Sequence, residues 1–194
     1  QKIADKGGFV SVPIHSSITG TVKAITRHPD SMGRLTKAIV IERLPEESFA
    51  ELKPVENPMS VPNNVLMDAI SEAGIIGLGG AAFPAHVKLS PPKDRVIDVL
   101  IINGCECEPY LTADERIMLE RTEALIDGIK LLKKILNVNK VLIGIEDNKM
   151  GIIDIVRHAA DIDHDIKVCV TKTRYPQGGE RQLIEALTGR IVPP

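Results

Sequence analysis

Glycine-rich segments can place a backbone against a ligand, and residues 74–84 form such a segment. They read Gly-Ile-Ile-Gly-Leu-Gly-Gly-Ala-Ala-Phe-Pro. Glycine adopts positive φ and lets the chain approach a ligand closely, while successive N–H groups can surround an anion. A phosphate or a flavin can therefore lie against this loop, and the alternative is a tight helix-to-strand connection that needs small residues. The spacing Gly77-x-Gly79-x-x-Ala82 alone is weak evidence, because the dinucleotide fingerprint follows a strand and the preceding residues here favour a helix.

A second polar stretch carries two carboxylates and an amide directly after an apolar run. Residues 96–102 read Val-Ile-Asp-Val-Leu-Ile-Ile, as in a strand covered on both faces, and Asn-Gly-Cys-Glu-Cys-Glu-Pro-Tyr follows at 103–110. Open α/β sheets bind ligands beyond the carboxyl ends of their strands, so these polar groups can hold ribityl or ribose hydroxyls. The alternative is a solvated turn that caps the next helix, with Thr112 and Glu115 as a capping box.

The third candidate stretch, Tyr-Pro-Gln-Gly-Gly-Glu at 175–180, leaves a predicted strand and opens the last helix. Its two glycines free the backbone, and a helix N-terminus favours a phosphate. Glu180 also has a simpler explanation, since an acid in the first turn complements the helix dipole. Lys88 can neutralise a phosphate, although a solitary surface lysine is usually only solvated.

The cysteine and histidine spacings argue against a metal site and against nucleophilic catalysis. Cys105 and Cys107 are separated by one residue, whereas zinc and cluster ligands commonly follow Cys-x-x-Cys spacing, and Cys169 lies on a distant predicted strand. The five histidines show no ligand spacing and no nucleophile pattern. We expect neither a metal ligand nor a catalytic side chain here.

The hydrophobic pattern predicts the elements that position these stretches. Apolar and β-branched segments at 9–10, 12–14, 21–25 and 38–42 indicate a small all-β module. Four prolines between residues 44 and 62 then interrupt regular structure. The expected domains are a β module over 1–50, a linker over 51–61 and an α/β domain over 62–194.

Strands and helices alternate in that last domain. We expect a helix over 65–73 with Gly74 as its stop, and then, in order, a strand over 96–102, a long helix over 114–136, a strand over 140–145, a helix over 152–159, a strand over 166–171 and a helix over 182–187 ended by Gly189. This alternation predicts an α/β fold, with a Rossmann-like, mostly parallel sheet and helices on both faces.

Composition excludes several function classes. A net charge of −2 gives no broad basic field, so nucleic acid is not an expected partner. The apolar runs fall far below the roughly 20 residues that cross a bilayer, so no membrane span is expected. No secretory signal is visible either. Three cysteines give no even disulfide framework, which fits a reducing compartment.

The three candidate stretches together resemble a known family. In order and spacing, residues 77–88, 103–114 and 175–189 look like the RnfC or RsxC family of membrane-associated electron transport complexes. They more distantly resemble the NADH- and FMN-binding flavoprotein of respiratory complex I, whose loop reads Gly-Arg-Gly-Gly-Ala-Gly-Phe-Pro. Residues 8–25 resemble the barrel-sandwich module of the RnfC family.

The resemblance implies a flavin site, at which NADH gives hydride to FMN and electrons then leave singly. The cofactor carries this chemistry, and the protein supplies orientation and electrostatics. The implied loop residues are Gly77, Gly79, Gly80, Ala81 and Phe83. Around the flavin and the nicotinamide we expect Lys88, Asn103, Glu106, Glu108, Tyr175, Gly178, Gly179 and Glu180. Three positions depart from the complex I pattern, namely Leu78, Cys105 and Gly179.

The resemblance also sets expectations for the whole protein. It implies a peripheral protein on the cytoplasmic side of the inner membrane, bound to other subunits of an ion-translocating complex. It implies 4Fe-4S clusters in a cysteine-rich region that these 194 residues lack, so we expect the chain to be part of a longer protein. The alternative is a scaffold domain that keeps the fold, binds no flavin and only docks partners.

Overall fold

Two units divide the chain. The computed structural model describes residues 1–78, 80–92 and 94–193, so the predicted site residue Gly79 lies outside the described residues. Unit 1 comprises Gln1–Asn57 and Asn64–Ser90, and unit 2 comprises Pro58–Asn63 and Pro91–Pro194. The domain boundaries expected near residues 50 and 62 remain a prediction.

Unit 1 contains two antiparallel strand pairs. β1 (Lys2–Ala4) pairs with β2 (Ile14–His15), and β3 (Gly20–Pro29) pairs with β4 (Leu35–Arg43). The strand segments predicted at 21–25 and 38–42 lie inside β3 and β4. No strand forms at residues 9–10, because the Ser11 hydroxyl bonds both the N–H and the carbonyl of Gly8 and closes a turn there.

Two helices of unit 1 flank the glycine-rich segment. α1 (Asn63–Glu72) ends as predicted before Gly74, which has φ +70° and donates its N–H to Ser71 O. α2 (Ala85–Lys88) follows the loop. The buried His86 donates from Nε2 to the carbonyl of Phe9 over 3.0 Å, and the two rings meet edge to face. This contact fixes α2 against the N-terminal segment.

A three-stranded parallel sheet forms the centre of unit 2. Its order is β5 (Leu100–Asn103), β6 (Val141–Glu146) and β7 (Ile166–Thr171). The prediction of a strand from residue 96 was wrong, because β6 offers its first partner, Val141, opposite Leu100. Residues 96–99 therefore have no neighbouring strand to bond within the described part of the chain.

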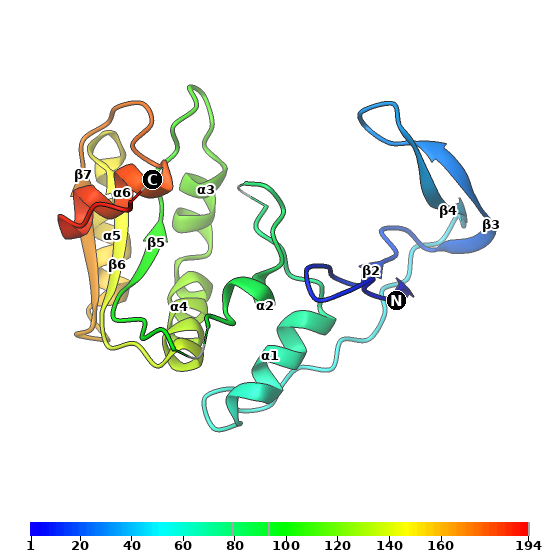
Figure 1. Ribbon diagram of the computed structural model, residues 1–194, viewed down its shortest axis with the longest axis horizontal. Coiled ribbons are helices and arrows are strands. Elements are labelled where there is room, and N and C mark those ends of the chain that lie inside the picture. Colours follow the sequence, from blue (N-terminus) through cyan, green and yellow to red (C-terminus); the bar gives the residue numbers. More distant parts are fainter. Residues whose placement is uncertain (79, 93, 194) are drawn as a thin grey trace. The chain divides into compact units, whose positions relative to one another are not determined.

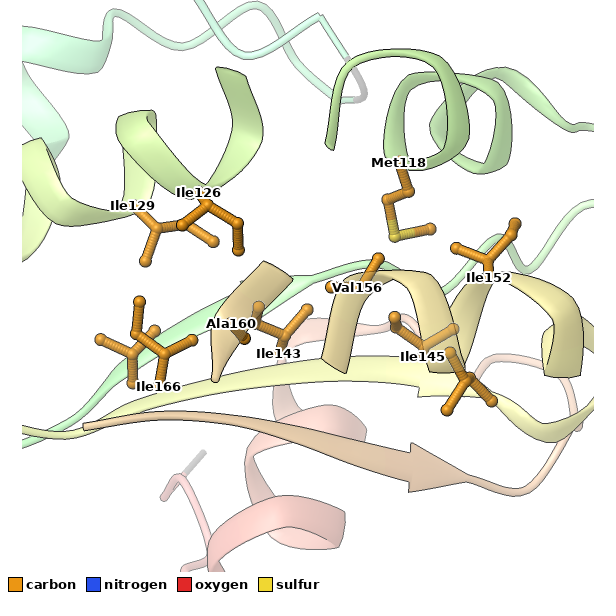
Figure 2. Close-up of a cluster of buried hydrophobic side chains, with 11 residues drawn as sticks. Met118, Ile126, Ile129, Ile143, Ile145, Ile152, Val156, Ala160 and Ile166 are labelled. Atoms are coloured by element: carbon orange, nitrogen blue, oxygen red, sulfur yellow. The ribbon is translucent and has the colours of Figure 1, made fainter. Parts of the chain in front are cut away.

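Helices cover both faces of this sheet. α3 (Ala113–Glu120), α4 (Thr122–Leu136) and α5 (Met150–Ala160) pack on one face, and α6 (Glu180–Thr188) packs on the other (Figure 1 and Figure 2). In β6, Ile143 and Ile145 enter the core with α3, α4 and α5. Gly144, between them, faces Leu183 of α6. The α/β prediction, with a small all-β module before it, is confirmed.

The single long helix predicted over 114–136 is instead two helices. Arg121 has φ −134° and ψ 37°, which interrupts the helix between α3 and α4. The Thr122 hydroxyl donates to Met118 O over 2.6 Å, a side-chain bond that competes with the regular backbone pattern. The break lets Met118 and Ile126 both reach the core (Figure 2).

No helix within the described residues has the length and apolar character needed to cross a membrane.

Replacing Ile153 with alanine tests the core of unit 2. Ile153 is fully buried between α5 and the sheet, so Ile153→Ala should lower the free energy of unfolding by about 3 kcal/mol. The matched control is Ile155→Ala on the same helix, where the side chain is 40% exposed. That change should cost well under half as much in urea unfolding, and equal losses would contradict the packing described here.

Candidate functional site

The glycine-rich loop of unit 1 is closed by its own backbone bonds. Gly77 N–H donates to Phe83 O over 3.0 Å, and the N–H groups of Gly80 and Ala82 both donate to Gly77 O. Ile76 and Pro84 form an isolated antiparallel bridge at its base. These three N–H groups are therefore used inside the loop and do not form the anion-binding concavity considered from the sequence.

The outer surface of this loop is nevertheless open. A Cβ added at Gly80 would meet no atom of the described residues within 4 Å. Leu78 is 86% exposed, Phe83 is 43% exposed, and Ala81 and Lys88 are exposed too. The backbone at Gly80 is therefore open to close approach by another group, which a residue without a side chain permits.

The carboxyl edge of the sheet in unit 2 brings two predicted stretches together. Asn103, the last residue of β5, donates from Nδ2 to Gly178 O over 2.8 Å and accepts the N–H of Cys105 on Oδ1. Gly178 N–H donates in turn to Cys107 Sγ over 2.9 Å. The loops after β5 and β7 are thus joined at Gly178.

Gly178 has no room for a side chain. A Cβ there would lie 2.9 Å from both Cys105 O and Cys107 Sγ. Its neighbour Gly179 caps α6, and Glu180 is the first residue of that helix and is exposed. Tyr175 is 77% exposed. Gly178 therefore shapes the edge, whereas Tyr175 and Glu180 are the accessible groups of this stretch.

A cluster of charged side chains lies at the base of the loop that follows β5, and the sequence did not reveal that these residues pair with one another. The Lys149 ammonium pairs with Glu106 over 3.3 Å and also pairs with Glu115. Lys149 belongs to the short helical turn η1 (Asp147–Lys149) after β6. Glu146, which ends β6 and is 1% exposed, accepts the N–H of Glu106 over 3.2 Å. Only the position of Glu146 at a strand's carboxyl end could have indicated this cluster from the sequence.

The capping box considered as an alternative at the start of α3 does not form. The side chain of Thr112 makes no capping bond, and Glu115 pairs with Lys149. The first turn of α3 is capped instead by Glu106, whose Oε1 accepts the N–H of Asp114 over 2.8 Å. Burial and the charge of Glu106 raise the pKa of the Asp114 carboxyl.

The two carboxylates of the 103–108 stretch have different surroundings. Glu106 has a side chain only 4% exposed, with both oxygens engaged, whereas Glu108 is exposed. A cavity of about 80 Å³ lies between the end of β5 and the helices α3 and α4, lined in part by Asn103, Asp114 and Met118. It is much smaller than the roughly 300 Å³ of a small ligand pocket, so it cannot enclose a flavin by itself.

The two cysteines of this stretch serve packing and backbone shape. Cys105 is buried, and its Sγ lies 3.5 Å from Thr171 Oγ1. Burial raises the pKa of the Cys105 thiol, against the opposing effect of that contact with Thr171. Cys107 holds the Gly178 N–H, and both thiols are free of disulfides.

The predicted site residues fall in both units. Gly77, Gly80, Ala81, Phe83 and Lys88 belong to unit 1. The others belong to unit 2, namely Asn103, Glu106, Glu108, Tyr175, Gly178, Gly179 and Glu180. The geometry joins the unit 2 residues at one sheet edge and keeps the unit 1 residues on one loop. Their shared role in one site stays a prediction.

Two protein families match the chain. Residues 1–45 match the family described as the RnfC barrel sandwich hybrid domain. Residues 70–194 match the family described as the Nuo51 FMN-binding domain. The second match spans the glycine-rich loop and the whole carboxyl edge of the sheet.

Similar proteins include the C subunits of two complexes named for ferredoxin:NAD⁺ oxidoreduction. The chain is 42% identical to the one from the Na⁺-translocating complex of Acetobacterium woodii, covering 100% of this chain and 44% of that protein. It is 44% identical to the one from the proton-translocating complex of Clostridium ljungdahlii, covering 100% of this chain and 42% of that protein. The chain thus spans less than half the length of these relatives.

A solved structure shares the fold of the chain. One chain of an NAD⁺-reducing NiFe-hydrogenase in the air-oxidized state aligns with a TM-score of 0.62 and 22% identity. The alignment covers 71% of this chain and 26% of that chain. At this identity the likeness shows a common fold.

Replacing Gly178 with alanine tests the junction between the two edge loops. The added Cβ would press on the backbone of Cys105 and on Cys107 Sγ, so we expect a loss of about 2 kcal/mol in unfolding free energy. The control is Gly128→Ala in α4, where a Cβ meets nothing within 4 Å and helix propensity should add about 0.5–1 kcal/mol. A Gly178→Ala protein as stable as the wild type would show that the loops are not in contact.

Proposed function

Because this chain belongs to the RnfC family, the C subunits of ion-translocating oxidoreductase complexes, we propose that it binds FMN and passes electrons between NADH and iron–sulfur clusters. The supporting observation is the match to an FMN-binding domain over residues 70–194, which contains every predicted site residue. The relatives' names give the proposed reaction, NAD⁺ coupled to ferredoxin. The clusters of this proposal lie outside the 194 residues, since a cubane takes four thiolates and the chain has three cysteines.

The described residues fit such a cofactor. The backbone at Gly80 is open to a flat ring, and Phe83 is an aromatic residue that is 43% exposed on the same loop. At the sheet edge, Glu108 and Glu180 are exposed carboxylates, which accept hydrogen bonds from ribityl or ribose hydroxyls. The position beyond the carboxyl ends of parallel strands is where this class of sheet binds nucleotides.

Each group of residues has a distinct task in this proposal. Bound FMN supplies the conversion between two-electron and one-electron transfer. Gly77, Gly80, Ala81 and Phe83 provide the surface against which it lies. Lys88, exposed at the end of α2, offers a positive charge for a phosphate. Asn103, Gly178 and Gly179 shape the sheet edge.

Three remaining residues complete the proposal. Tyr175 and Glu180 stand beside the place where the nicotinamide would enter, and Glu106 fixes the loop that presents Glu108. The family also supports a location for the protein, at the periphery of the membrane on its cytoplasmic side. Its partners there are other subunits of the same complex, as the relatives' names describe.

Replacing Gly80 with valine tests the flavin assignment. Because no atom of the described residues occupies the space of that side chain, the fold should tolerate it, whereas a bound flavin would be displaced. We expect FMN affinity, measured by quenching of flavin fluorescence, to fall at least about tenfold, or 1.4 kcal/mol. The control is Gly7→Val, a second exposed glycine with open space around it.

Equal FMN affinity in wild type, Gly80→Val and Gly7→Val would overturn the place of the flavin on this loop. A wild-type protein that binds no FMN at all would favour the alternative, a domain that only docks partners.

Replacing Glu180 with glutamine separates the nicotinamide side from the flavin side. We propose that this carboxylate faces NADH, so Glu180→Gln should raise the KM for NADH about tenfold, or about 1.4 kcal/mol, and leave FMN affinity within about twofold. NADH oxidation with an artificial electron acceptor gives the first value, and FMN titration gives the second. The control is Glu185→Gln, which replaces another exposed glutamate on the same helix. Matching losses in both values would place Glu180 on the flavin.

A further inference from the structure

Lys149 gathers three segments of unit 2 that are far apart in the sequence. It lies in η1, after β6, and its side chain is 12% exposed. Its ammonium contacts Glu106 Oε2 at 3.3 Å, in the loop after β5, and pairs with Glu115 in the first turn of α3. Lysine is rarely buried unless it is paired with an acid. The burial of Lys149 between two glutamates therefore indicates a role in holding these segments together.

Glu106 is held at three points by its surroundings. Its Oε1 accepts the N–H of Asp114 over 2.8 Å, its Oε2 faces Lys149, and its own N–H donates to Glu146. Its side chain is 4% exposed. Glu108, two residues later, is exposed. The loop therefore buries one carboxylate as an anchor and presents the other.

The ammonium balances a surplus of negative charge. Glu106, Glu115 and Glu146 surround this region, and the pKa of Asp114 is raised by burial and by Glu106. Burial lowers the pKa of Lys149, but its bonds to Glu115 and Glu106 outweigh that effect and raise it. Removing the ammonium would leave Glu106 as a buried charge without its ion-pair partner, which is costly in a site of low dielectric.

We propose that Lys149 is a positioning residue for the nucleotide-binding edge. By holding Glu106 at the start of α3, it fixes the 103–108 loop in the shape that presents Glu108 to the ligand. The proposal rests on the proposed FMN function for its effect on binding. Its structural half, the fixing of the loop by Lys149 through Glu106, stands without a ligand.

A double-mutant cycle in the full chain tests the ligand half. Lys149→Met and Glu106→Gln should each lower FMN affinity about tenfold, and the double variant should be no weaker than Glu106→Gln alone, because Lys149 acts through Glu106. Lys149→Arg should keep FMN affinity within about threefold of wild type. Lys167→Met, an exposed lysine on β7, is the matched control and should change nothing.

Additive losses in that cycle would overturn the proposal, because they would mean that Lys149 contacts the ligand itself. If Lys149→Met does not fold, Lys149→Gln takes its place. The double variant Lys149→Gln/Glu106→Gln, in which amides replace both charges, is then compared with Glu106→Gln alone, and its FMN affinity should again be no weaker.

Amide hydrogen exchange without FMN tests the structural half. Lys149→Met should speed exchange at the amides of Glu106 and Asp114 at least about tenfold, whereas Glu108→Gln should leave both unchanged. Unchanged protection in Lys149→Met would overturn the proposal even if FMN binds. If the wild type binds no FMN, the proposed function fails. The exchange rates at the amides of Glu106 and Asp114 still test whether Lys149 fixes the loop.

Discussion

The burial of β6 is the constraint on which the rest of unit 2 depends. All six residues from Val141 to Glu146 are buried, and the strand bonds to β5 on one side and to β7 on the other. Its isoleucines pack against α3, α4 and α5, while Gly144 admits Leu183 of α6. A central strand covered on both faces fixes the register of both neighbours, and so it fixes where their carboxyl ends meet.

Polar contacts then complete the edge that the strands define. The loops after β5 and β7 are joined by hydrogen bonds among Asn103, Gly178 and Cys107. The loop after β5 is also held by the contacts of Glu106 with Lys149 and Glu146. Buried polar groups are costly unless they are paired, so such a network favours one arrangement of the loops. The rigidity of this network would favour the proposed binding of FMN and NADH, because binding would then cost little ordering of the protein.

Membership of the RnfC family and the local geometry support the same function from different directions. The family match places an FMN-binding domain over residues 70–194. The geometry adds which groups are accessible, since Gly80 and Glu108 are open and Glu106 and Gly178 are enclosed. The division between presenting and supporting residues is therefore a property of packing, and residue type alone does not reveal it.

The sequence determined the alternation of strands and helices, the helix stops at Gly74 and Gly189, and the bounds of β7 at 166–171. These features depend on neighbours within a few residues, whose periodicity and backbone preferences are visible in the chain. Only the tertiary structure decided that β5 starts at Leu100, because a strand ends where its partner ends. It also decided that Glu106 is paired, since its partner Lys149 lies 43 residues away in the sequence and only folding of the sheet brings the two charges together.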